Sequence, residues 1–300
     1  MAKTRVILDA PTNLGLKPPG PGREPGVRHL PVALRAHGLL QRLAAEDGGS
    51  VVPPAYDPRI DPTTGIRNAA SIAAYSRQLA AAVGDMVASG QFPIVLGGDC
   101  SLLLGPMLAL RRLGRYGLCF LDGHLDLLSP DTSHTKGAAG MDLALATGRG
   151  PALLADLDGL GPLVQDQHVA LVGYRGDLEG YGSIADPGSR PGFDWWSTED
   201  VRKTGPETVA SDLVSRFSAS ALDGFWIHLD VDILDEAIMP AVDSPLPGGL
   251  SYSELGALLR GLMGSEAAVG MEITILDPER DPQGGILARF VDFVEEVFQP

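Results

Sequence analysis

The stretch Phe225-Trp-Ile-His-Leu-Asp230-Val-Asp232 indicates the fold class most directly, because an apolar run passes straight into two aspartates. Two other stretches share this design: Pro93-Ile-Val-Leu-Gly-Gly-Asp-Cys-Ser101 and Leu118-Cys-Phe-Leu-Asp122-Gly-His124-Leu-Asp126. Short continuous apolar runs are typical of strands that are buried on both faces of a parallel sheet. Polar side chains at their ends would then gather at one edge of that sheet, where open parallel sheets bind ligands.

The rest of the chain alternates between apolar runs of this kind and longer segments with a period near 3.6. The runs predict strands over residues 5–8, 50–52, 92–96, 116–121, 168–172, 225–230 and 268–276. The periodic segments predict helices over residues 28–45, 66–88, 102–113, 207–217, 252–263 and 286–298. Alternating strands and helices favour an α/β fold with a mainly parallel central sheet. Because no linker divides the chain, we expect one domain over residues 1–300.

Two stretches are rich in Gly and Pro and lack either period. Residues 9–31 predict a loop near the N-terminus, and residues 177–193 predict an insertion over one sheet edge. Long loops of this kind serve as lids or binding loops in some proteins and are disordered in others.

Composition excludes several classes of function. The chain has 23 basic and 38 acidic residues, a net charge of -15, which disfavours binding to nucleic acid or to anionic membranes. No apolar stretch reaches the roughly 20 residues of a membrane helix, and no secretory signal is present. Two cysteines, Cys100 and Cys119, cannot form a disulfide framework, so we expect a cytoplasmic protein.

The polar clusters at the strand ends predict a metal site. Asp230 and Asp232 are two residues apart, as are Asp122, His124 and Asp126, so on extended chain each set faces one side. Four converging carboxylates repel one another unless a cation lies between them. Carboxylates with imidazole suit Mn²⁺, Zn²⁺, Ni²⁺ or Fe²⁺, and about six ligands suit two metals.

Other polar residues near these clusters have less specific interpretations. Any single aspartate in such a turn more often caps a helix than binds a metal. Asp99 is as consistent with a turn former as with a ligand, and Asp235 with an orienting or capping group. His228, inside an apolar strand, is interpreted as a packed core residue.

These motifs resemble those of the ureohydrolase superfamily, which contains arginase, agmatinase and formiminoglutamase. The match covers three motifs of the family: Gly-Gly-Asp-His-Ser at residues 97–101, Asp-Ala-His-x-Asp at residues 122–126 and Asp-x-Asp-x-x-Asp at residues 230–235. Two further stretches, residues 25–39 and 240–252, are also similar to the family. The resemblance implies a three-layer α/β/α fold and a binuclear Mn²⁺ site with two ions per chain. It implies six metal ligands: Cys100, Asp122, His124, Asp126, Asp230 and Asp232.

The sequence departs from the family pattern at three positions. Cys100 replaces a histidine ligand, and its soft thiolate would favour Zn²⁺ or Fe²⁺ over Mn²⁺; the alternative is a buried thiol that binds nothing. Ala139 replaces the proton-shuttle histidine of arginases, and His134 in the same loop is a candidate substitute. Ile275 replaces a glutamate that anchors the guanidinium, while Glu272, three residues earlier, should point to the other face of its strand.

By resemblance we expect a hydrolase of non-peptide C–N bonds in linear guanidines, modified guanidines or amidines, although not a plain arginase. Asp126 is the candidate for orienting the attacking water and taking its proton. The alternatives are a metal-dependent amidohydrolase of another substrate class and a non-catalytic pseudo-enzyme with an arginase fold. The expected partners are a small guanidino or amidino substrate and further copies of the chain, as a trimer or hexamer.

Overall fold

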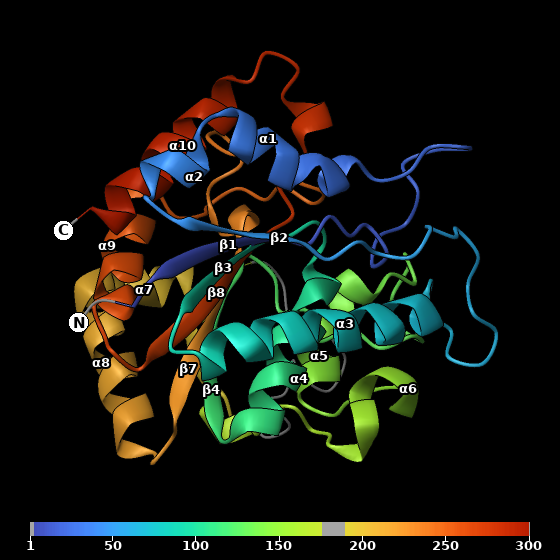
Figure 1. Ribbon diagram of the computed structural model, residues 1–300, viewed down its shortest axis with the longest axis horizontal. Coiled ribbons are helices and arrows are strands. Elements are labelled where there is room, and N and C mark those ends of the chain that lie inside the picture. Colours follow the sequence, from blue (N-terminus) through green and yellow to red (C-terminus); the bar gives the residue numbers. More distant parts are fainter. Residues whose placement is uncertain (1–2, 176–189, 300) are drawn as a thin grey trace.

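The computed structural model, which describes residues 3–175 and 190–299, is built around a wholly parallel sheet. In the described residues this sheet has eight strands in the order β2-β1-β3-β8-β7-β4-β5-β6 (Figure 1). The strands are Arg5–Asp9 (β1), Glu46–Ser50 (β2), Phe92–Leu96 (β3), Tyr116–Leu121 (β4), Val169–Tyr174 (β5), Asp194–Ser197 (β6), Gly224–Asp230 (β7) and Ala268–Thr274 (β8). The prediction of a mainly parallel α/β sheet is confirmed.

Helices cover both faces of the sheet (Figure 1). The first face carries α1 (Leu30–Ala36), α2 (Leu39–Arg42), α7 (Thr198–Thr204), α8 (Pro206–Ala219), α9 (Tyr252–Met263) and α10 (Gly285–Phe298). The second carries α3 (Ala69–Ala88), α4 (Leu104–Leu113), α5 (Asp142–Ala146) and α6 (Ala152–Ala155). This arrangement confirms the three-layer fold, and it explains why β3, β7 and β8 are buried along their whole length.

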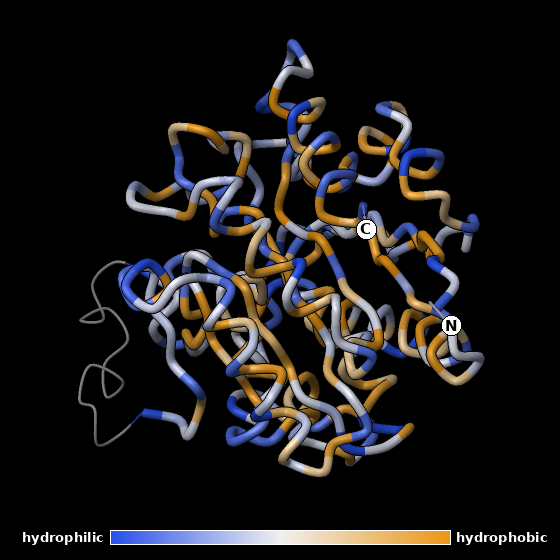
Figure 2. Tube along the Cα trace, turned by 90° about the vertical axis from the view of Figure 1, so that its left-hand side faces the viewer, coloured by the Kyte–Doolittle hydropathy of each residue, from blue (hydrophilic) through white to orange (hydrophobic). Residues whose placement is uncertain are grey.

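The hydropathy of the chain follows these layers. Figure 2 shows the hydrophobic segments concentrated in the interior and the hydrophilic ones mainly in the outer loops and helix ends. No helix within residues 3–175 and 190–299 is long and apolar enough to cross a membrane.

The predicted elements were wrong mainly at the edges of the sheet. The second strand lies at Glu46–Ser50 rather than over residues 50–52, and it is mostly exposed and polar because it is an edge strand. The last edge strand, β6, was missed because four half-buried residues show no pattern. The predicted helix over residues 28–45 is divided by Gly38, whose left-handed φ of 82° separates α1 from α2.

The two irregular stretches have different outcomes. The predicted loop over residues 9–31 is confirmed only over residues 10–25, because a 3-10 helix spans Gly26–His29 and α1 begins at Leu30. Residues 10–25 pass over the carboxyl edge of the sheet, where Asn68 Nδ2 donates to Leu14 O (2.9 Å) and Tyr56 Oη donates to Leu16 O (3.0 Å). Most of the predicted insertion at 177–193 lies outside the described residues.

Candidate metal centre

The end of β7 supplies two carboxylates. Asp230 is the last residue of the strand, and the chain then turns into the short 3-10 helix Val231–Ile233. Asp230 Oδ1 accepts a hydrogen bond of 2.8 Å from Asp232 N, which fixes this turn. Both carboxylates are buried, and the turn sends them into two different ligand groups.

The end of β4 supplies the next three candidate ligands. Asp122 N donates to Val172 O (3.1 Å), so the ladder continues to this residue, and Asp122 Oδ1 accepts from His124 N (2.6 Å). A Cβ at Gly123 would lie 2.4 Å from Arg175 Nη1 and 2.8 Å from Asp232 O, so only glycine fits there. The close approach lets Gly123 N donate to Asp232 Oδ1 (3.0 Å) and joins the two strand ends.

Asp122, His124 and Asp232 form the first ligand group, in which one ligand atom from each lies within 4.8 Å of the others. His124 Nδ1 is 2.9 Å from Asp232 Oδ2 and 3.7 Å from Asp122 Oδ1. Burial lowers the pKa of His124, but the charges of Asp232 and Asp122 outweigh it and raise this pKa far above its usual value. For Asp232 the two effects have opposite signs: burial raises its pKa, but the positive charge of the adjacent His124 imidazolium lowers it more, so the net shift is downward.

Cys100, His228 and Asp230 form the second group, whose ligand atoms also lie within 4.8 Å of one another. Cys100 begins the 3-10 helix Cys100–Leu103 after β3, and its thiol donates to Asp230 Oδ2 at 2.8 Å. Burial, followed by the charge of Asp230, raises the pKa of Cys100 well above its usual range. Burial and the charges of Asp232 and Asp122 do the same to the pKa of Asp230.

Asp126 lies beside these groups and has a buried neighbour that the sequence analysis missed. Asp126 adopts a left-handed φ of 46°, and its carboxyl group lies within hydrogen-bonding reach of that of Asp142, the first residue of α5. Burial raises the pKa of both groups well above the usual range, and for Asp142 the charges of Asp126 and Asp122 add to it. Two carboxyl groups in contact share a proton unless a cation separates them.

The pocket above these residues has a volume of about 160 Å³ and is lined by five of the six predicted ligands, all except Asp122. Leu16, Lys17, Ala139, Asp243 and Ile275 form other parts of its wall. Ile275 adopts φ 72°, an outlier for a β-branched residue, with its N donating to Gly98 O at 2.7 Å.

The remaining candidates lie outside this pocket. His134 is exposed, whereas its neighbour Thr135 lines the pocket, so the structure does not bring the proposed shuttle to the predicted metal ligands. Asp99 forms a turn: its Oδ1 accepts from Ser101 N (3.0 Å) and Oγ (2.5 Å). Asp235 Oδ2 accepts from Gly248 N (2.7 Å) and Gly249 N (3.1 Å), contacts that agree with its interpretation as an orienting or capping group.

Arg175 was also missed, although it directly follows β5. Its Nη2 donates to the carbonyl groups of Asp232 (2.5 Å), Leu234 (3.2 Å) and Leu246 (3.1 Å) and so holds the loop after β7. Burial lowers the pKa of Arg175 despite the nearby carboxylates. Its two terminal nitrogens are engaged by backbone carbonyl groups, whereas its Nε is buried and has no hydrogen-bond partner among the described residues.

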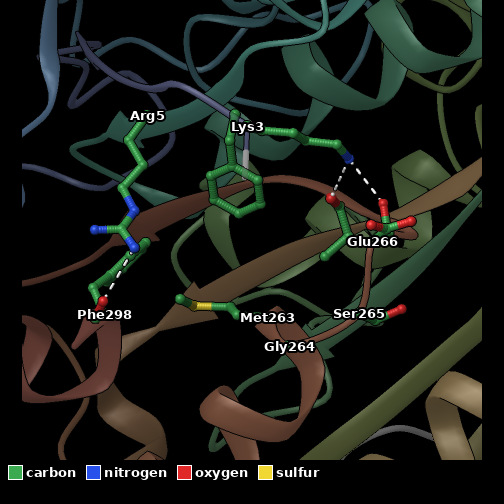
Figure 3. Close-up of a pocket in the computed structure, with 9 residues that line it drawn as sticks. Lys3, Arg5, Met263, Gly264, Ser265, Glu266 and Phe298 are labelled. Atoms are coloured by element: carbon green, nitrogen blue, oxygen red, sulfur yellow. Dashed lines mark hydrogen bonds between the residues drawn. The ribbon is translucent and has the colours of Figure 1, made fainter. Parts of the chain in front are cut away.

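A larger cavity, of about 630 Å³, lies at the opposite edge of the sheet and has no comparable chemistry (Figure 3). Its cations are already bonded to carbonyl groups: Lys3 Nζ to Glu266 O (2.9 Å) and Ala268 O (2.8 Å), and Arg5 Nη2 to Phe298 O (3.1 Å). We therefore place the functional site at the carboxyl edge.

The donor set fits divalent cations. Asp122 Oδ2 and His228 Nε2 are buried and have no hydrogen-bond partner among the described residues, so each could offer a lone pair to a cation. Repulsion among the buried carboxylates would also be relieved by positive charge between them.

Fold and site together define an α/β/α protein with a carboxylate-rich metal-binding pocket at the carboxyl edge of a parallel sheet. The family model of the arginase family matches residues 7–297, so the chain belongs to the arginase family, and the predicted ureohydrolase kinship is confirmed.

Individual relatives agree with this assignment. The arginase of Bacillus caldovelox is 29% identical over 263 residues, which cover 85% of this chain and 87% of that protein. The arginase of Bacillus subtilis strain 168 is 27% identical over 303 residues, covering 99% and 98%. The native structure of the Bacillus caldovelox arginase at pH 5.6 superposes with a TM-score of 0.87 at 27% identity, covering 100% of this chain and 99% of that one.

Proposed function

We propose that this protein is a hydrolase that uses two divalent cations to cleave a C–N bond in a small guanidine or amidine. The observation that carries the proposal is the pair of ligand groups at the floor of one pocket, in a chain of the arginase family. Asp122, His124 and Asp232 would hold one ion, and Cys100 and Asp230 the other, with Asp126 beside them. The carboxylates and imidazole suit Mn²⁺, while the thiolate of Cys100 shifts the preference towards Zn²⁺ or Fe²⁺.

Bound cations would lower the pKa of water and polarise the substrate. Among the protein groups, Asp126 is the one placed to orient the attacking water and to receive its proton, because it lines the pocket beside both ligand groups. The carboxyl group of Asp142 lies within hydrogen-bonding reach of Asp126; when protonated, it would donate to Asp126 and hold that carboxylate in one orientation.

The pocket walls point to a substrate with a charged end. Lys17 lines the pocket and makes no hydrogen bond or ion pair with any described residue, so its ammonium group is available for a carboxylate. Asp243 offers the opposite charge on the same wall, with Arg280 Nη2 4.0 Å away. Ile275 supplies an apolar surface, which suits a guanidine or amidine less basic than a plain alkylguanidine.

The test is a screen of the Mn²⁺-, Zn²⁺- and Fe²⁺-loaded protein against carboxylate-bearing guanidines and amidines, with urea and ammonia measured separately. Urea release supports a ureohydrolase, and ammonia without urea supports an amidohydrolase of another class. Neither product from a fully metal-loaded protein would overturn the proposal in favour of a non-catalytic arginase-fold protein.

Two controls exclude contaminating host enzymes. Asp126→Asn, purified in parallel, should bind the substrate and lose turnover. Asp235→Asn, a matched change in the loop after β7 whose carboxylate does not line the pocket, should retain turnover.

A homo-oligomer remains a proposal from the family resemblance. Light scattering at several protein concentrations tests it, and a concentration-independent monomer would contradict it.

A further inference from the structure

His228 lies in the middle of β7 and is completely buried. Its sheet neighbours at the same register are Phe120 in β4 and Glu272 in β8. The Phe120 ring stacks on the imidazole with centroids 4.5 Å apart and planes 6° from parallel. On the other side Glu272 Oε1 is 2.7 Å from His228 Nδ1. These two contacts fix the plane of the ring and the direction of each nitrogen.

The bond to Glu272 also determines the form of the imidazole. A carboxylate accepts hydrogen bonds, so Nδ1 carries the proton and a neutral ring leaves a lone pair on Nε2. Nε2 is buried and has no hydrogen-bond partner in residues 3–175 and 190–299. Leaving such a group unpaired costs about 1–3 kcal/mol, so a core role alone does not account for it.

The neighbourhood of His228 supplies the missing partner. One ring nitrogen of His228, Cys100 Sγ and a carboxylate oxygen of Asp230 all lie within 4.8 Å of one another. All three residues are buried, and His228 and Asp230 are two positions apart on the strand. Sulfur, nitrogen and oxygen donors thus converge from β7 and the turn after β3.

We propose that His228 is a ligand of the cation held by Cys100 and Asp230, and that Glu272 is the positioning residue that orients its ring. This inference rests on the metal centre of the proposed function and adds a ligand to it. A carboxylate bonded to the outer nitrogen of a metal-bound histidine is a recurrent arrangement that fixes the tautomer and strengthens the ligand. The structure thereby supplies imidazole to this ion although position 100 is a cysteine.

Nitrogen-15 NMR of the wild-type protein labelled at its six histidines provides a direct test. Addition of Zn²⁺, which is diamagnetic, should shift one nitrogen of His124 and one of His228, with His168→Gln and His228→Phe used for assignment. A response from His124 alone at full metal occupancy would overturn the inference and leave the proposed function standing. No response and no bound metal would overturn both.

A variant at the positioning residue tests the role of Glu272. Glu272→Gln keeps the shape of the side chain and should weaken one of the two Zn²⁺ sites about 10- to 100-fold in calorimetric titrations, since outer partners of metal-bound histidines have effects of this size. The other site and the metal-free circular dichroism spectrum should be unchanged. Glu254→Gln, a matched change at the cap of α9, should leave both sites intact.

The NMR signature separates positioning from simple packing. In Glu272→Gln the His228 nitrogens should show a mixed tautomer without metal, whereas the wild type should show a proton on Nδ1 alone. Wild-type affinity at both sites together with an unchanged tautomer would refute the role of Glu272. If the variant fails to fold, the wild-type spectra still decide whether His228 is a ligand.

Discussion

Asp142→Asn should make the metal-free protein more stable at neutral pH, although it replaces a residue next to the proposed metal ligands. Asp142 is fully buried, its Oδ1 accepts from Leu143 N at 2.7 Å, and its carboxyl group contacts that of Asp126. Burial, and then the charges of Asp126 and Asp122, raise the pKa of Asp142 well above its usual range. Among the described residues no Lys or Arg side chain forms an ion pair with it.

The sign of the effect follows from proton linkage. The folded-state pKa of Asp142 is raised, so above the ordinary pKa of about 3.9 the unfolded chain loses this proton first, and stability falls as pH rises. Holding the carboxyl group neutral at pH 7 costs the folded state at most about 4 kcal/mol, from 1.36 kcal/mol for each of roughly three pH units. Asparagine has no proton to lose and still donates to Asp126. Leaving its second N–H unpaired costs about 1–3 kcal/mol, so we expect a net gain of at most about 1–3 kcal/mol.

Urea unfolding in EDTA, at intervals from pH 4.5 to pH 8, measures this difference. The gain from Asp142→Asn should be smallest at pH 4.5 and grow with pH. Asp158→Asn is a control, because hydrogen bonds from Arg112 and Arg77 lower the pKa of Asp158, so its contribution to stability changes only below the ordinary pKa of about 3.9. The stability difference of that variant should therefore be nearly constant from pH 4.5 to pH 8. A stability difference for Asp142→Asn that does not change with pH would refute the reasoning.

Three further predictions concern the metal and the substrate. Cys100→Ser should weaken one metal site at least about tenfold, whereas Cys100→His should retain Mn²⁺. Because the folded protein raises the pKa of the Cys100 thiol, metal occupancy in the wild type should also fall as pH drops. Equal metal content in wild type and Cys100→Ser would contradict its assignment as a ligand. Mn²⁺ at 100 times its Kd should stabilise the protein by about 2.7 kcal/mol in urea unfolding, and an unchanged midpoint would exclude specific binding. Lys17→Met should raise KM for a carboxylate-bearing substrate about tenfold with little change in kcat, and an unchanged KM would show that Lys17 does not contact the substrate.

The central strands could be predicted from sequence because burial on both faces requires a continuous apolar run. The predicted bounds of β3 and β4 match the structure, and those of β7 differ by one residue. The edge strands could not be predicted, since β2 is formed by the polar residues Glu46-Asp-Gly-Gly-Ser50 through pairing with β1. Such pairing depends on tertiary position and leaves no residue pattern.

The candidate site likewise contains residues that the sequence could predict and residues that it could not. The clustered aspartates predicted its place at the sheet edge, because parallel strands end together. His228 was interpreted as core, since an apolar run gives no sign of a partner, and Glu272 was considered only as a substrate anchor. Only the register between β7 and β8 brings these two residues together. Asp142 was missed because a lone aspartate before an apolar helix has the pattern of an ordinary helix start.

The strand order also has a consequence for how the protein acquires metal during biosynthesis. Cys100 follows β3 and Asp230 ends β7, and the strand between them in the sheet is β8, Ala268–Thr274. On a ribosome, the second ligand group is therefore assembled only after nearly the whole chain has been synthesised, so cations cannot template its early folding. For the proposed metal centre, we therefore expect cations to bind after the sheet has formed rather than during synthesis of the chain.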